Sequence, residues 1–207
     1  MAEEQDHTRA MVSQIIEGLV DPGFVVLKDV FSREVIHQWH AWAETHRAQG
    51  EMRSAGLGKS RALDVRIRQD QIHWLDFEAP ELQPYALFVA ALTQALNREL
   101  FLGISGVEGH FACYPTGGFY TRHRDRFTTE DTRQISLVVY LNPEWQACHG
   151  GECVLYDDAG VELARVVPQG NTLICFRSEM LHEVLPTQAM RYSLTGWLLR
   201  RNFHVSI

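Results

Sequence analysis

The stretch GHFACYPTGGFYTRHRD, residues 109–125, opens a series of short β-strands that continues nearly to the end of the chain. Its apolar and aromatic residues flank a turn signal at 115–118, and similar Gly-, Pro- or Asn-containing turns recur every eight to twelve residues. We predict strands at 110–114, 119–125, 134–141, 151–156, 161–167, 171–177, 182–185 and 191–199. Eight short strands separated by turns at this spacing predict a double-stranded β-helix, or jelly-roll, core.

The residues that precede this stretch favour helices. Apolar residues recur at helical spacing over 8–20, 32–50 and 84–102, which predicts three helices. Residues 24–27 and 65–75 are instead predicted to be extended. The Gly-rich residues 103–109 are interpreted as the end of the last helix. We therefore expect an α+β fold in one domain, 1–207, with helical support from 1–109 and the jelly-roll core over 110–201.

Composition excludes several classes of protein. Of the 207 residues, 45% are hydrophobic and 22% charged, which is typical of a globular chain with a sizeable core. The formal net charge of −7 counts against a protein whose main partner is nucleic acid. No apolar run reaches the roughly 18 residues of a membrane span, and the first residues do not resemble a secretory signal. Four scattered cysteines favour a reduced, cytoplasmic setting.

A His-x-Asp pair lies in the predicted strand 119–125. Residues i and i+2 of a strand point to the same face, so the side chains of His123 and Asp125 should converge. Such a short motif arises easily by chance, but His182 opens a later strand with apolar neighbours on both sides. Two imidazoles and one carboxylate from separate strands form the facial set that binds iron(II) and leaves positions open for a substrate and dioxygen.

Arg191 begins the last predicted strand. Inside an apolar barrel its guanidinium needs an anionic partner, such as the carboxylate of a bound dicarboxylic acid, whereas on an edge strand it could point to solvent. Cys148, His149 and Cys153 do not predict a zinc site, because their spacing is unlike that of structural zinc sites and a fourth ligand is missing.

These motifs together resemble the 2-oxoglutarate- and iron(II)-dependent prolyl 4-hydroxylases, and most closely the group of the hypoxia-inducible-factor prolyl hydroxylases and their bacterial relatives. The resemblance extends from the second predicted helix to the end of the chain. It is carried by Arg68-Gln69-Asp70 with Ile72 and Trp74, Cys113-Tyr114-Pro115, Tyr120-x-x-His123-x-Asp125, Tyr140-Leu141-Asn142 with Trp145, Gly150-Gly151, His182-Glu183-Val184 with Pro186, and Arg191-Tyr192 with Trp197.

The resemblance implies a role for each matched residue. Iron(II) would be bound by His123, Asp125 and His182. The cosubstrate 2-oxoglutarate would be bound by Arg191 and Tyr140 at its distal carboxylate, with Tyr114, Thr195 and Trp197 nearby. The substrate would be contacted by Arg68, Asp70, Tyr120 and Arg133. The implied reaction consumes dioxygen, decarboxylates 2-oxoglutarate to succinate and carbon dioxide, and hydroxylates C4 of a prolyl residue, with ascorbate as a reductant.

In this group the segment that matches residues 50–68 is a lid over the peptide substrate. Here it is rich in Gly, Lys and Arg, including Lys59 and Arg61, which is also typical of an exposed connector. Its positive charge favours a substrate of acidic character. We expect Arg68 and Asp70 to fix this lid, although an exposed ion pair of little energetic value is the alternative.

Three functional hypotheses remain at this point. The first is a protein prolyl 4-hydroxylase, for which translation elongation factor Tu is the candidate substrate and oxygen sensing a further hypothesis. The second is an oxygenase of the same type that acts on a free amino acid or an alkylated nucleobase. The third is a non-catalytic barrel that senses a small acid. The sequence leaves the oligomeric state open.

Overall fold

The computed structural model describes residues 2–56, 64, 66–126 and 132–200. Three α-helices are formed: α1 (Ala2–Val20), α2 (Arg33–Ala48) and α3 (Gln83–Leu100). One sheet contains β1 (Phe24–Lys28), β2 (Arg53–Ser54), β3 (Gln71–Trp74), β4 (Ile104–Tyr114), β6 (Arg133–Tyr140), β9 (Thr172–Arg177) and β11 (Arg191–Arg200). A second sheet contains β5 (Tyr120–His123), β7 (Cys153–Tyr156), β8 (Glu162–Val166) and β10 (Leu181–Val184). Single 3-10 turns span Pro80–Leu82 and Ala147–His149.

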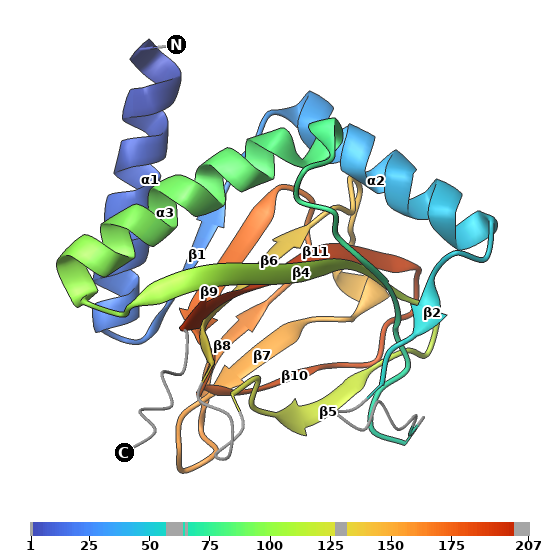
Figure 1. The fold of residues 1–207 in the computed structure, drawn as a ribbon. Helices are drawn as coiled ribbons and strands as arrows, with labels where there is room; N and C mark the ends of the chain where they lie inside the picture. Colours follow the sequence, from blue (N-terminus) through green and yellow to red (C-terminus); the bar gives the residue numbers. More distant parts are fainter. Residues whose placement is uncertain (1, 57–63, 65, 127–131, 201–207) are drawn as a thin grey trace, which may run out of the picture.

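The two sheets form a jelly-roll whose larger sheet is covered by the helices (Figure 1). The larger sheet has the strand order β1-β9-β6-β11-β4-β3-β2, and the smaller has the order β5-β10-β7-β8. Neighbouring strands are antiparallel in both sheets. The predicted α+β class with a jelly-roll of about eight strands, now β4 to β11, is therefore confirmed.

The central strand β11 shows how the sequence assigns the two faces of the larger sheet. Tyr192, Leu194 and Leu198 belong to the main hydrophobic core together with residues of all three helices. The alternate residues Arg191, Ser193, Thr195 and Trp197 point away from the helices and line a cavity between the sheets. Burial of one apolar face thus fixes which side chains enter the cavity.

The helices cover the sheet because each presents an apolar face to it. Ser32 caps α2 by accepting a hydrogen bond from the backbone N–H of Val35. On α3, Tyr85 is fully buried and its hydroxyl approaches Gly196 of β11 so closely that a Cβ at that position would overlap it. A larger residue at 196 would therefore displace the Tyr85 side chain from its place between helix and sheet.

Several predicted boundaries were wrong. Residues 104–109, predicted to end the preceding helix, instead form the first half of β4, where Gly109 lies so near the carbonyl oxygen of Thr195 that a Cβ would come within 2.8 Å of it. Strand β5 ends at His123, so Asp125 lies beyond it in a bend. The extended segment predicted over 65–75 forms a strand only at Gln71–Trp74. The boundaries of short or glycine-containing strands are hard to predict from the sequence, because they depend on pairing with neighbouring strands rather than on local propensity.

No helix within the described part of the chain is long and apolar enough to cross a membrane.

Candidate active site

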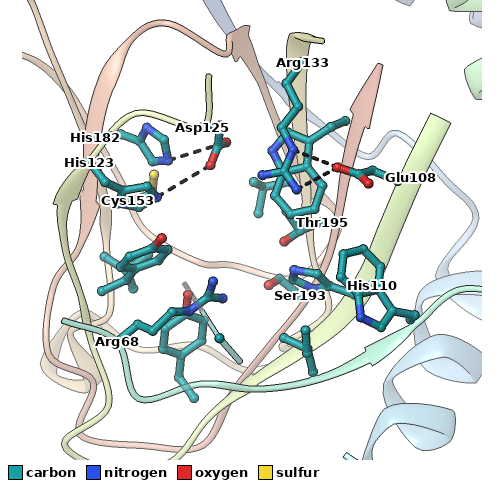
Figure 2. Close-up of a pocket in the computed structure, with 18 of the residues that line it drawn as sticks. Arg68, Glu108, His110, His123, Asp125, Arg133, Cys153, His182, Ser193 and Thr195 are labelled. Atoms are coloured by element: carbon teal, nitrogen blue, oxygen red, sulfur yellow. Dashed lines mark hydrogen bonds and ion pairs between the residues drawn. The ribbon is translucent and has the colours of Figure 1, made fainter. Parts of the chain in front are cut away.

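A cavity of about 1040 Å³ opens between the two sheets. Every site residue predicted from the sequence lines it except Asp70, which is bound to the lining residue Arg68. Its volume is at the upper end of the range for small-molecule sites, so it can hold a cosubstrate together with part of a larger ligand. Figure 2 shows His123, Asp125 and His182 on one side of this cavity and Glu108, His110 and Arg133 on the other.

The two histidines and the aspartate meet at one point. His123 at the end of β5 pairs directly with His182 on β10, and their ring centroids are 4.2 Å apart. The Nε2 atoms of His123 and His182 lie 3.6 and 3.7 Å from the two carboxylate oxygens of Asp125. The candidate ligand atoms all lie within 4.8 Å of one another, and no other such group of three exists among the described residues.

The backbone orients both imidazoles for metal binding. Nδ1 of His123 lies 2.7 Å from the carbonyl oxygen of Thr121, and Nδ1 of His182 lies 3.0 Å from that of Met180. A carbonyl only accepts, so each Nδ1 carries the proton and each Nε2 presents its lone pair toward Asp125. This is the arrangement of a metal-binding histidine whose second nitrogen is fixed by a hydrogen bond.

Asp125 is held by a contact that the sequence analysis missed. Because β5 ends before it, the expectation that a shared strand face aligns it with His123 was wrong; the bend after β5 places it instead. The hydroxyl of Ser136 on β6 donates a hydrogen bond of 2.7 Å to Oδ2 of Asp125, and Ser178 lies 2.9 Å from the same hydroxyl. Both serines are fully buried, so they form a fixed support behind the carboxylate.

The protonation states also suit a cation site. Burial and the neighbouring His123 lower the pKa of His182 to about 4, so its ring is neutral near pH 7. Burial alone would raise the pKa of Asp125, but the imidazoles of His182 and His123 hold it well below its usual range. Two neutral nitrogen donors and one carboxylate, without a thiolate, fit iron(II) rather than a closed structural zinc site.

The end of the cavity formed by Tyr114 and Tyr140 also contains Arg191, which points inward rather than to solvent. It is 2% exposed, and its Nε donates a hydrogen bond of 2.9 Å to the carbonyl oxygen of Gly151. No carboxylate of the described residues lies within ion-pair distance of its guanidinium, which is 4.8 and 4.9 Å from the ring centres of Tyr114 and Tyr140. Gly151 has φ +69 and a Cβ there would be 3.1 Å from the Arg191 side chain, so glycine is needed.

Two tyrosines line this end of the cavity. Burial raises the pKa of Tyr140 and of Tyr114 well above the usual range, so both hydroxyls stay protonated. The Tyr140 hydroxyl has no hydrogen-bond partner among the described residues and can donate to a bound anion. Thr195 and Trp197 follow Arg191 along the cavity face of β11, as predicted. An unpaired guanidinium and a free phenol hydroxyl together fit a carboxylate.

Arg68 and Asp70 form a buried ion pair, so the alternative of an exposed pair was wrong. Arg68 donates to Asp70 at 2.7 and 2.5 Å, and the Asp70 side chain is fully buried. The Arg68 guanidinium lies 4.4 Å from the ring centre of Tyr120, and the Tyr120 ring stacks on that of His123 with a centroid distance of 3.5 Å. Burial raises the pKa of Tyr120 to about 12. The pair thus braces a metal-facing histidine through Tyr120.

Only part of the segment predicted as a lid belongs to the described structure. Arg53 and Ser54 form β2, which pairs with β3 at the edge of the larger sheet and lines the cavity mouth. Residues 57–63 and 65, which include Lys59 and Arg61, lie outside the described residues.

Arg133 is held by Glu108, a residue that the sequence analysis did not select. Its Nε and Nη2 lie 2.7 and 2.6 Å from Oε1 of Glu108, and its guanidinium stacks 3.7 Å from the ring centre of Trp197. Glu108 precedes Tyr114 by six positions on β4, so strand alternation from Tyr114 could have placed it on the cavity face.

The cysteine-containing alternative did not form a site. Cys148 and His149 lie in the 3-10 turn after β6, and Nδ1 of His149 accepts a hydrogen bond from the backbone N–H of Gln146. Cys153 is buried on β7 and faces the main cavity, a position that the sequence analysis missed.

Comparison with known proteins agrees with this geometry. Residues 109–199 match the model of the 2OG-Fe(II) oxygenase superfamily. Prolyl hydroxylase EGLN3 from Homo sapiens is 39% identical over 212 residues, which cover 93% of this chain and 84% of the relative. The chain therefore belongs to the 2-oxoglutarate- and iron(II)-dependent oxygenases, a superfamily that uses iron(II), 2-oxoglutarate and dioxygen. Within that superfamily it is a relative of the prolyl hydroxylases.

Solved structures give the same family. A Pseudomonas putida prolyl-4-hydroxylase has a TM-score of 0.85 and 36% identity, with 92% of this chain and all of that chain covered. A Trichoplax adhaerens prolyl hydroxylase, solved with a hypoxia-inducible-factor peptide, has a TM-score of 0.86 and 26% identity, with 96% and 93% covered. The chain spans about half the length of Egl nine homolog 1 from mouse and rat, which it also matches.

Proposed function

We propose that the protein is a dioxygenase that hydroxylates a prolyl residue of a protein substrate at C4 and couples this to the decarboxylation of 2-oxoglutarate. One observation carries the proposal. The His123–Asp125–His182 cluster shares a single cavity with the buried Arg191, which has no ion-pair partner among the described residues. A metal site beside an anion site is what a chelating dicarboxylic acid requires, and a non-catalytic barrel that binds a small acid has no need of the metal site.

The three clustered side chains would hold iron(II) on one face and leave the other positions open to ligands from the cavity. The chemistry that iron(II), 2-oxoglutarate and dioxygen supply together is oxidative decarboxylation to succinate and carbon dioxide with hydroxylation of a C–H bond. His123 and His182 would donate through Nε2, because each Nδ1 is committed to a backbone carbonyl. Ser136 would keep the Asp125 carboxylate in its binding orientation.

Arg191 and the Tyr140 hydroxyl would bind the distal carboxylate of 2-oxoglutarate, with Thr195 beside them. Tyr114 would donate a hydrogen bond near the chelating carboxylate, and Trp197 would close the wall toward Arg133. Tyr120, Arg68 and Asp70 would border the substrate and exclude water from the metal. Residues 110–201 would carry the catalytic core and 1–109 its support, in a single domain.

A prolyl residue in a polypeptide is the substrate class that the relatives support. The Trichoplax adhaerens enzyme was solved with a hypoxia-inducible-factor peptide. We propose that the substrate of this chain is a cytoplasmic protein, with translation elongation factor Tu as the first candidate. We further propose that the chain itself is cytoplasmic and that ascorbate serves the enzyme as a reductant. All four cysteines are free, in keeping with a reducing compartment.

Two measurements, performed one after the other, test the proposal. Anaerobic addition of iron(II) and 2-oxoglutarate should produce a metal-to-ligand charge-transfer band, which His182→Ala should abolish. With dioxygen and elongation factor Tu, mass spectrometry should detect one added oxygen on a prolyl residue for each succinate formed. Absence of the band would favour the non-catalytic barrel. Succinate formation without prolyl oxidation would reject this substrate, and oxidation of free proline instead would favour the amino acid oxygenase.

A further inference from the structure

His110 is a buried histidine on the cavity face of β4 to which the sequence analysis assigned no role. It pairs with Trp74 on β3 and with Thr195 on β11, and only 4% of its surface is exposed. The centroid of its ring lies 5.4 Å from that of Trp74, with an angle of 84° between the ring planes. The corresponding values for Trp197 are 5.2 Å and 66°. Figure 2 shows it near Ser193, across the cavity from the metal-facing histidines.

One atom of this ring lacks a partner. Nδ1 of His110 is buried and forms no hydrogen bond within the described part of the chain. Buried polar groups in folded proteins are almost always hydrogen-bonded, so a ligand in the cavity that His110 lines is the natural source of the missing partner. The indole rings of Trp74 and Trp197 pack against the imidazole, and neither forms a hydrogen bond with Nδ1.

The chemistry of the surroundings favours an uncharged ligand group at this position. Burial lowers the pKa of His110 to about 4, so near pH 7 the ring has one donor and one acceptor nitrogen and no charge. The nearby guanidinium of Arg133 is already neutralised by Glu108. A free carboxylate or ammonium group would find no counter-charge on His110, whereas a peptide group offers the matching acceptor and donor.

His110 adjoins the proposed cosubstrate site on the side that lies away from Arg191. Arg191 and Tyr114 pair at one end of the β11–β4 ladder, and His110 pairs with Thr195 four residues further along. Beyond His110 the row ends at Trp74, which is 49% exposed at the cavity mouth. A ligand that extends from the metal site to solvent along this wall therefore passes His110, while an anion held by Arg191 lies toward the other end.

We propose that His110 is a specificity-determining residue whose imidazole accepts a hydrogen bond from the main-chain N–H that follows the target prolyl residue, so that the cavity selects a prolyl residue in a polypeptide over free proline. The inference rests on the proposed prolyl hydroxylase function. It adds a contact that distinguishes a peptide from an amino acid, because free proline has no flanking peptide group.

The test compares His110→Leu, which removes the hydrogen bond, with His110→Asn, which keeps a donor and an acceptor near the position of Nδ1. The probe is the shortest peptide that the wild-type enzyme hydroxylates, taken from elongation factor Tu or from a digest of cytosolic proteins. We expect kcat/KM for this peptide to fall about tenfold in His110→Leu, mainly through KM, and to stay within threefold of wild type in His110→Asn. The anaerobic dissociation constant of 2-oxoglutarate should change less than twofold.

The matched control is His40→Leu, which removes a histidine that packs on Tyr192 outside the cavity; it should leave all of these values unchanged. A second measurement needs no variant. Replacing the amide that follows the prolyl residue by an ester should lower kcat/KM of the wild-type enzyme at least fivefold, and His110→Leu should not discriminate between the two peptides.

Several results would overturn the inference. These are an unchanged KM in His110→Leu, an equal loss in His110→Asn, a parallel loss of 2-oxoglutarate affinity, or indifference of the wild type to the ester. A wild-type enzyme that hydroxylates no peptide of the digest would refute the proposed function itself, and the inference with it.

Discussion

Replacing Ser136 by alanine tests whether the buried hydroxyl behind Asp125 maintains the metal site. Ser136 is fully buried and donates a hydrogen bond of 2.7 Å to Oδ2 of Asp125. Alanine fits the same space but cannot donate a hydrogen bond to the carboxylate. A hydrogen bond to a charged group contributes about 1.5–3 kcal/mol. At about 1.4 kcal/mol per factor of ten, metal affinity should fall about 10- to 100-fold, the range known for such supporting contacts.

The assay is a titration of the metal-free enzyme with Mn²⁺, followed by electron paramagnetic resonance in the presence of 2-oxoglutarate. Mn²⁺ favours the same nitrogen and oxygen donors and does not oxidise during the measurement. Ser178→Ala is the matched control, because Ser178 is equally buried and contacts Ser136 at 2.9 Å, but its removal leaves the bond to Asp125 intact. We expect a change in its dissociation constant of less than threefold.

The two variants separate metal binding from general stability. Both should lower the free energy of unfolding of the metal-free protein by about 1–3 kcal/mol, because each leaves a buried polar group with one partner fewer. Only Ser136→Ala should also weaken Mn²⁺ binding. A dissociation constant within twofold of wild type for Ser136→Ala, or an equal loss for Ser178→Ala, would refute the assigned role of the hydroxyl.

Three further changes probe other parts of the site. Asp70→Asn should lower the free energy of unfolding by about 3–5 kcal/mol in chemical denaturation, since it leaves the buried Arg68 without its counter-charge. It should also impair turnover of a protein substrate more than uncoupled decay of 2-oxoglutarate; equal effects would contradict a role beside the substrate. Arg191→Met should raise the dissociation constant of 2-oxoglutarate about 100-fold in an anaerobic titration, and an unchanged constant would place the carboxylate elsewhere. His110 should make stability depend on pH: the unfolded chain binds its proton near pH 6.5 and the folded chain only near 4, so stability is lost as the pH falls through this window. Relative to His110→Leu, the wild type should lose about 3 kcal/mol of unfolding free energy between pH 7 and pH 4, and parallel denaturation curves would contradict this.

The candidate metal-binding residues could be predicted because their signal is local. His123 and Asp125 stand two positions apart, and His182 opens a short strand among apolar neighbours. Residue types alone then restrict the chemistry, since two imidazoles and a carboxylate favour an open iron site. The detailed reason given for Asp125 was nevertheless wrong, because the strand ends at His123 and a bend supplies the final orientation.

The supporting residues could not be predicted because they depend on register between distant strands. Ser136 reaches Asp125 only because β6 lies between β9 and β11 with Ser136 opposite Phe176 and Trp197. Glu108 reaches Arg133 because β4 and β6 pair with opposite edges of β11. A single sequence specifies alternation within each strand but not which residue of the neighbouring strand stands opposite.

The orientation of Arg191 follows from the alternation of side chains along β11 once the strand order is known. Seen alone, an arginine at the start of a strand points to solvent more often than inward. Strand β11, however, is central in its sheet, and the burial of Tyr192, Leu194 and Leu198 against the helices fixes its register. A slip by one residue would expose that core, so Arg191 must enter the cavity. A buried guanidinium without a carboxylate partner among the described residues is costly, and the proposed binding of an anion would offset that cost.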